Sequence, residues 1–276
     1  MNMTLDTHVT ALISKHRRNQ NELLFLSACI SGLHGFFGHG LSISNKRATK
    51  IHVMLPVTDS DDPDYSYMAK YTTKMRGGML MRYRSYVAEQ LAHLEYRNIP
   101  ALQEKPWNLF RVENLFEVSR PKARNKDDYG IGNIPFVASG AVNNGVMKCC
   151  KPKTNEPLDD GNYITVSPVD GTSFYQPMAF LGRGGAGSSI LILRNNDMNL
   201  LRGEFMARMI QQTCAKYNYG HMGSKDGIKR ERVMLPIDNI GELDYAYMEQ
   251  YIINMMRKKY EQYLSFLAER EAQKLS

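Results

Sequence analysis

The sequence predicts an α+β protein that combines one domain built on a twisted mixed sheet with two long helices and a truncated N-terminal α/β stub. A stretch of nineteen residues occurs twice, at 53–71 and 233–251, with nine identical positions and a constant offset of 180 residues. Only the second copy follows a long series of short apolar runs between turn signals. An internal duplication with an incomplete first half therefore organises the chain.

Each copy has the pattern of a short strand, a linker and a long helix. Met-Leu-Pro in both copies is an apolar run that proline ends, because proline lacks the donor that a strand ladder needs. Asp64 and Asp244 then serve as N-caps, and apolar residues follow at steps of three and four. We expect the two helices to pack as an antiparallel, coiled-coil-like pair. The predicted interface consists of Met68, Tyr71, Met75 and Tyr83 in the first helix and Met248, Ile252, Met255 and Leu267 in the second.

The duplication also sets the predicted domain boundaries. The first domain is incomplete and only its tail is present, in a stub at residues 1–62, and residues 101–242 form the one complete domain. The long helices occupy 63–100 and 243–276, with a kink or local break predicted at Gly77-Gly78. In the complete domain, β-rich apolar runs predict strands and one periodic segment predicts a helix. The strands are expected at 115–118, 134–137, 163–166 and 190–193, and the helix at 200–216.

Composition narrows the class of protein. The net charge of +7 and the pI near 9.1 indicate a polyanionic partner, of which nucleic acid is the commonest. No segment has the length and apolarity of a membrane span or a signal peptide, which predicts a cytoplasmic protein without a membrane partner. The four cysteines lack metal-ligand spacing, so we expect neither a metal nor a cofactor.

A series of motifs in the second half points to a family. The motifs, in order, are Trp107-x-x-Phe110, Leu115-Phe116-Glu117-Val118, Ile134-Pro135-Phe136-Val137-Ala138-Ser139, Asn143-Asn144-Gly145-Val146, Phe174-Tyr175, Tyr217-x-Tyr219-Gly220, the basic stretch 229–232 and Asp244-Tyr245-x-Tyr247. This order resembles the target-recognition domain of the specificity subunits of type I restriction-modification systems and their type IIB relatives. The match runs to Tyr251, and its tail recurs in the first copy.

The resemblance implies a noncatalytic DNA reader. Such subunits carry two target-recognition domains, each reading half of a bipartite sequence, and two long antiparallel helices that dock methyltransferase subunits. The implied partners are double-stranded DNA, a DNA methyltransferase subunit and a restriction subunit. The chain departs from the family because its first domain is a stub. A half-site reader, a product of a split or truncated gene, and one half of a homodimer or of a pair with a second specificity fragment all remain open.

Predicted DNA contacts lie on loops of the complete domain. Cations neutralise phosphates, and asparagine and serine side chains bond to bases or phosphates. The predicted set is Arg120, Lys122, Arg124, Lys126, Ser139, Asn143, Asn144, Arg183, Lys225, Lys229, Arg230 and Arg232. The competing interpretations are a solvated loop for the first four cations, a turn for Asn144-Gly145, and charge on an exposed edge strand for the last four cations. The glycine-rich segment 183–189 lacks the phosphate-loop pattern, which argues against a nucleotide-phosphate site. We expect instead a flexible loop that closes on DNA. His39 and His221 are expected to be structural or solvated.

A DNA adenine or cytosine amino-methyltransferase is the alternative function. Residues 36–40 fit the pattern Phe-x-Gly-x-Gly, and Asp62-Pro63-Asp64-Tyr65 is close to Asp-Pro-Pro-Tyr. The second copy retains neither the Phe-x-Gly nor the proline, and residues 36–40 follow a helical pattern rather than a buried strand. We therefore predict no catalytic residues.

Overall fold

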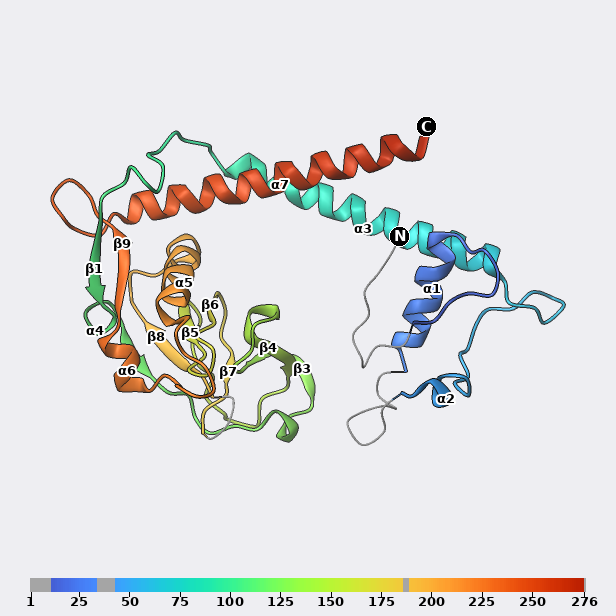
Figure 1. Cartoon of the computed structure of the whole chain (residues 1–276), viewed down its shortest axis with the longest axis horizontal. Helices are drawn as coiled ribbons and strands as arrows, with labels where there is room; N and C mark the ends of the chain where they lie inside the picture. The colour runs from blue at the N-terminus through green and yellow to red at the C-terminus, as the bar shows by residue number, and fades with distance from the viewer. Residues whose placement is uncertain (1–10, 34–42, 186–188, 276) are drawn as a thin grey trace. The chain divides into compact units, whose positions relative to one another are not determined.

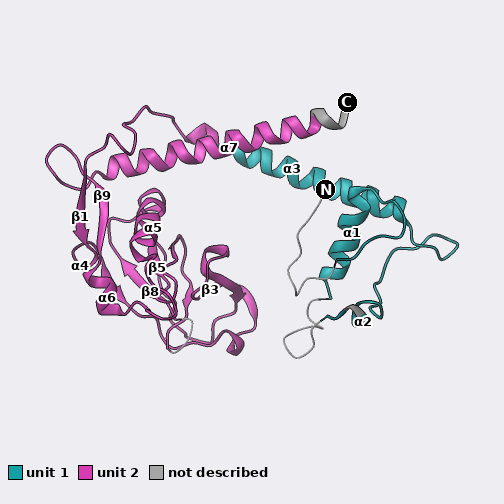
Figure 2. Ribbon diagram, viewed as in Figure 1, with its two compact units in different colours: residues 1–90 teal, residues 91–276 magenta. Residues whose placement is uncertain are grey.

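The computed structural model describes residues 11–33, 43–185 and 189–275. The chain divides into two compact units, residues 1–90 and residues 91–276 (Figure 2). The predicted stub and the alternative methyltransferase motif are therefore described only in part, since residues 36–40, with His39, lie outside the described ranges. Helices together with antiparallel and mixed sheets confirm the predicted α+β class.

The unit of residues 91–276 holds three small sheets rather than one large sheet (Figure 1). The four-stranded sheet has the order β2 (Glu117–Ser119), β8 (Leu191–Arg194), β5 (Tyr163–Val166), β6 (Ser173–Gln176), and all its neighbours are antiparallel. The three-stranded sheet has the order β4 (Val146–Cys150), β3 (Ile131–Val137), β7 (Leu181–Gly182), and is mixed because β3 and β7 run parallel. The two-stranded sheet pairs β1 (Trp107–Arg111) with β9 (Arg232–Pro236).

The four predicted strands are all present, with one change at the first. Residues 112–115 form a short helix, α4 (Val112–Leu115), so β2 starts only at Glu117. The predicted helix is α5 (Leu200–Cys214), which the side chain of Asn199 caps by accepting from the Arg202 N–H at 3.0 Å. Buried side chains of β5, β8 and α5 pack against one another in one core. The three-stranded sheet has its own, smaller cluster around Phe136, Cys150 and Leu181.

The second long helix, α7 (Tyr245–Leu275), starts at the predicted cap. Asp244 accepts from the Tyr247 N–H at 2.8 Å, and its carboxylate also receives Lys105 Nζ at 2.6 Å. Met248 is fully buried in the core with α5, and Ile252 packs against the same core. The domain itself covers Met248, which removes it from the predicted face for the other long helix, whereas Ile252 is half-buried and its place in that face stays a prediction.

Residues 94–106 form a strap that joins the end of the first long helix to β1. Side chains of α7 bind the backbone of this strap. Asn254 donates to the Arg97 carbonyl at 2.7 Å and accepts from the Arg97 N–H at 3.2 Å. Gln250 donates to the Glu95 carbonyl at 2.9 Å, and Tyr247 to that of Pro100 at 3.0 Å. Polar side chains on α7 thus replace the missing ladder partners of the strap.

The unit of residues 1–90 is helical in its described part. It contains α1 (Gln20–Ser31), α2 (Asn45–Ala48) and most of α3 (Tyr65–His93). α3 runs without a break through Gly77 and Gly78, so the predicted local break is absent. A Cβ at either glycine would meet nothing within 4 Å, which means that no packing demand acts on the helix there.

The two copies of the repeat share their turns and helices but not their strand. Val57 bridges Pro63 as Ile237 bridges Leu243, and both turns lead into a helix capped by aspartate. β9 pairs with β1, whereas residues 51–56 belong to no strand. The predicted strand around Met54 is therefore wrong, because a strand needs a neighbour. Met54 is 93% exposed, and its counterpart Met234 is 47% exposed.

Candidate nucleic-acid interface

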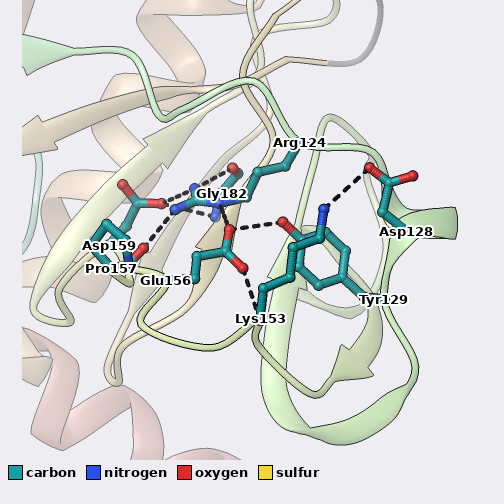
Figure 3. A network of polar contacts seen from close by, with 8 residues as sticks. All are labelled: Arg124, Asp128, Tyr129, Lys153, Glu156, Pro157, Asp159 and Gly182. Atoms are coloured by element: carbon teal, nitrogen blue, oxygen red, sulfur yellow. Dashed lines mark hydrogen bonds and ion pairs between the residues drawn. The ribbon is translucent and has the colours of Figure 1, made fainter.

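The basic segment, residues 120–126, follows β2 and turns one of its cations, Arg124, inward (Figure 3). Arg124 donates through Nε to Glu156 at 2.8 Å and through Nη1 to Asp159 at 2.7 Å. Its remaining bonds reach the carbonyls of Gly182 at 2.9 Å and Pro157 at 2.8 Å. Only 3% of the side chain is exposed. Arg124 is therefore removed from the set of predicted DNA contacts, since its charge is neutralised within the protein.

The network around Arg124 keeps the Glu156 carboxylate ionised. Burial acts to raise the pKa of Glu156, but hydrogen bonds from Arg124, Tyr129 and the Lys153 N–H outweigh it, and the pKa is lowered. Burial, followed by the hydrogen bond to Glu156, raises the pKa of Tyr129 to about 12. The phenol therefore remains a donor at neutral pH. Together these bonds fix the loop 153–159 against the basic segment.

Two glycines allow the basic segment to lie directly on the strand β7 and the loop after it. Gly184 donates to the Lys122 carbonyl at 2.9 Å, and a Cβ on Gly184 would come within 2.0 Å of the Pro121 carbonyl oxygen. A Cβ on Gly182 would come within 2.9 Å of the Pro121 side chain. Such distances exclude any larger residue without movement of the backbone. The hydrogen bonds of Arg124 and the close packing at Gly182 and Gly184 thus form a clamp, which holds the basic segment against β7 and the loop 153–159.

The clamp leaves the preceding cations in solvent. Arg120 and Lys122 are exposed, while Lys126 is half-buried at the start of a short 3-10 helix (Lys126–Asp128). The neighbouring loop supplies Arg183, which is half-buried and whose Nε makes no hydrogen bond to the described residues. Arg183 follows β7 and precedes Gly184, so it lies beside the Lys122 backbone. The backbone pairing of the two segments, with a bridge between Ala123 and Gly184, therefore places Lys122 and Arg183 on neighbouring stretches of chain.

The predicted hydrogen-bonding residues lie on the segment that follows β3. Ser139 already donates to the Ser189 carbonyl at 2.8 Å, which leaves its lone pairs as acceptors. Asn143 and Asn144 have φ of 50° and 53°, as the turn interpretation expects, and their side chains are exposed. The Ala138 N–H donates to the Gly145 carbonyl at 3.0 Å and closes the turn. The turn thus presents two amide side chains on a fixed backbone.

Of the last four predicted cations, three lie on a short helix, α6 (Lys225–Arg230), and Arg232 is the first residue of β9. Lys225 and Lys229 line a hollow of about 580 Å³ with residues 113–118. Glu113 and Glu117 line the same hollow, so its charge is mixed. Arg230 and Arg232 are exposed. This group contacts β2, the strand that leads into Arg120.

Two kinds of residue escaped the sequence analysis. Glu156 and Asp159 decide that Arg124 points inward, but a spacing of more than thirty residues carries no readable signal. Tyr219 is 88% exposed in a tight turn that the Asn218 and His221 backbones close. Its aromatic ring therefore faces solvent, which the motif Tyr217-x-Tyr219-Gly220 did not indicate. His221 stacks on Tyr217 at 5.8 Å between ring centroids, which is the structural role expected of it.

The described residues contain no cluster of three or more histidine, cysteine, aspartate or glutamate side chains fit to hold a metal ion. Within the same part of the chain, no helix is long and apolar enough to span a membrane.

Comparisons with known proteins place the chain in a family. The family described as type I restriction modification DNA specificity domain matches residues 104–262. The S.BcgI specificity subunit of a type II restriction enzyme from Heyndrickxia coagulans is 28% identical over 255 residues, which cover 91% of this chain and 72% of that protein.

Solved structures of specificity subunits are also similar. The type I S subunit from M. genitalium matches with 13% identity and a TM-score of 0.43, over 90% of this chain and 69% of that one. The HsdS subunit from Thermoanaerobacter tengcongensis matches with 11% identity and a TM-score of 0.39, over 73% and 49% respectively. Because the family match covers more than half of the sequence, the chain belongs to the type I restriction-modification DNA specificity family and is a specificity subunit, a noncatalytic component of a restriction-modification system.

Proposed function

We propose that residues 101–242 form a target-recognition domain that reads one half of a bipartite DNA sequence, and that the long helices at 63–100 and 243–276 dock methyltransferase subunits. The observation that carries the proposal is the clamped basic segment. Arg124 is used to fix the loop, and Arg120, Lys122 and Arg183 remain for phosphates. A net charge of +7 favours the approach of a polyanion.

Specificity would come from the turn that carries Asn143 and Asn144. Asn143 and Asn144 present amide groups, which pair bidentately with adenine in the major groove. Their left-handed backbone and the hydrogen bond from Gln176 to the Asn144 carbonyl at 3.0 Å hold the turn rigid before DNA arrives. A preorganised turn loses little entropy on binding. Lys126, Ser139, Lys225, Lys229, Arg230 and Arg232 remain proposed contacts around this centre.

Duplex-DNA binding at several salt concentrations tests the phosphate contacts. Arg120→Ala with Lys122→Ala should lower the slope of log K against log salt by about 2, since each lost phosphate contact removes roughly one counterion. The matched control is Lys258→Ala with Lys259→Ala, which removes the same charge from exposed positions on α7. Equal slopes for the two double variants would remove the basic segment from the interface.

Selection from random duplexes tests half-site reading. The chain should enrich one contiguous block of specified bases, and Asn143→Ala or Asn144→Ala should relax the choice at single positions inside it. Two separated blocks would contradict the half-site proposal. Incubation with S-adenosylmethionine and the selected DNA should transfer no methyl group without a partner subunit.

Partner docking is tested on the exposed aromatic part of α7. Tyr263 and Phe266 are 41% and 45% exposed, with ring centroids 6.0 Å apart. Aromatic residues are enriched at protein interfaces. Phe266→Lys should weaken association with a methyltransferase subunit, whereas Ser265→Lys, the next exposed position, should not. We retain an antiparallel helix pair, with Met68, Tyr71, Met75 and Tyr83 on one helix and Ile252, Met255 and Leu267 on the other, as part of this proposal.

A further inference from the structure

The first copy of the repeat lacks a neighbour that the second copy has. β9 of the second copy is paired along its whole length with β1, and its residues Val233 and Leu235 are fully buried. The equivalent residues Val53 and Leu55 are only half-buried, and residues 51–56 belong to no ladder. The two copies thus differ by one strand.

The paired copy shows how that strand is seated. Phe110 lies opposite Val233 and Asn108 opposite Leu235 in an antiparallel register. At the two ends, the Val112 N–H donates to the Glu231 carbonyl at 2.9 Å and the Ile237 N–H donates to the Pro106 carbonyl at 3.0 Å. Because ladder bonds recur at every second residue, the N–H groups of Asn108 and Phe110 face β9, and that of Leu109 faces away.

Two side chains anchor the strand beside the ladder. The Trp107 ring stacks on Phe205 with centroids 6.2 Å apart, and Lys105 Nζ lies 2.6 Å from the Asp244 carboxylate. At the offset of 180 residues, the first copy keeps both receptors, Phe25 and Asp64. Phe25 packs edge-on against Tyr71, and Asp64 caps α3 through the Tyr67 N–H at 2.8 Å. The first copy therefore has the residues that seat an anchored strand, and none of the described residues pairs there as a strand.

We propose that this seat, Val53 to Leu55 with Phe25 and Asp64, binds an extended strand with the pattern Lys-x-Trp-x-x-Phe, supplied in trans by another polypeptide. Among the described residues, the backbone of residues 53–55 has no ladder partner, and a strand without a partner is the usual basis of strand addition. The aromatic residue of the strand covers Phe25, and its cation meets Asp64. Residues 105–110 of the same chain do not fill the seat, because β9 already holds them as part of β1.

A labelled peptide with the sequence of residues 104–112, added to the full chain, tests the proposal. Saturable binding is expected, together with at least about tenfold slower amide exchange at Val53 and Leu55. A peptide N-methylated at the position of Phe110 should bind at least about tenfold more weakly, because it loses a ladder bond and meets the edge with a methyl group. N-methylation at the position of Leu109, whose N–H faces away, is the matched control and should leave binding unchanged.

A variant of the chain tests the ionic anchor. Asp64→Asn keeps the N-cap but removes the charge, and should weaken the unmodified peptide by about threefold. Asp62→Asn, on the exposed turn just before it, is the matched control and should not.

Three results would overturn the proposal. One is the absence of saturable binding. Another is protection that appears in β9 instead of at Val53 and Leu55, which would show exchange with β1. The last is protection of Val53 and Leu55 without peptide that disappears on dilution, which would show that a second copy of the chain fills the edge.

Discussion

The Phe205 ring meets the Tyr251 ring edge-on, with centroids 5.6 Å apart and an interplanar angle of 89°. The same contact occurs between Phe25 and Tyr71, at 5.7 Å and 84°, and both members are offset by 180 residues. The caps of the two helices, Asn19 and Asn199, keep the same offset. The duplication therefore extends from the cap of α1 to the first turns of α3, and it preserves the packing of the long helix on the short one.

This aromatic contact should be a main support of the second unit. Phe205 is 4% exposed and packs against both Trp107 and Tyr251. Phe205→Ala should lower the free energy of unfolding by about 3–5 kcal/mol in denaturant titrations, because it leaves a cavity. Phe266→Ala removes an aromatic ring that is 45% exposed and should change stability by less than about 0.5 kcal/mol. Equal effects would show that the contact does not stabilise the fold.

Removing only the cation of the buried ion network should destabilise the fold more than replacing the cation and both carboxylates together. Arg124→Met leaves Glu156 and Asp159 without their partner and should cost about 3–5 kcal/mol of unfolding free energy. Adding Glu156→Gln and Asp159→Asn should recover part of that loss. The exposed Arg120→Met serves as the control, with less than about 0.5 kcal/mol. A triple variant no more stable than Arg124→Met would argue against an uncompensated charge as the cause.

Acid should weaken the same network in a defined direction. The pKa of Glu156 is lowered from its ordinary value of 4.5, so the carboxylate stabilises the fold above that pH, and the stabilisation is lost as the pH falls through the lower, folded-state pKa. Thermal melts should show a smaller loss of Tm on acidification for Glu156→Gln than for the unchanged chain. Glu269→Gln, exposed on α7, should keep the original profile. Parallel profiles for all three proteins would contradict the assignment.

Two glycines in helices should respond to alanine with opposite signs. A Cβ on Gly203 of α5 would lie 2.1 Å from the Tyr175 ring, so Gly203→Ala should lower the free energy of unfolding by about 1–3 kcal/mol. A Cβ on Gly78 of α3 meets nothing within 4 Å, and Gly78→Ala should gain about 1 kcal/mol of helix stability. Circular dichroism melts of the two variants measure both changes. A gain at Gly203 would mean that the Tyr175 ring moves freely.

The sequence by itself predicted the duplication, the four strands of the complete domain, the helix α5, both long helices and the family. These features depend on local patterns, such as apolar periodicity, turn residues and caps, that are readable in any short window. It also placed the turn at Asn144 and the exposed cations Arg120 and Lys122. The proposed DNA contacts among them remain predictions.

Only the tertiary structure decided which of these patterns found a partner. Val53 and Val233 stand in the same local sequence, but only Val233 has β1 beside it and becomes a strand. Arg124 reads as one more basic residue, yet Glu156 and Asp159 draw it inward across more than thirty residues. Strand pairing and ion pairing join residues distant in sequence, and local propensity carries no record of that partner.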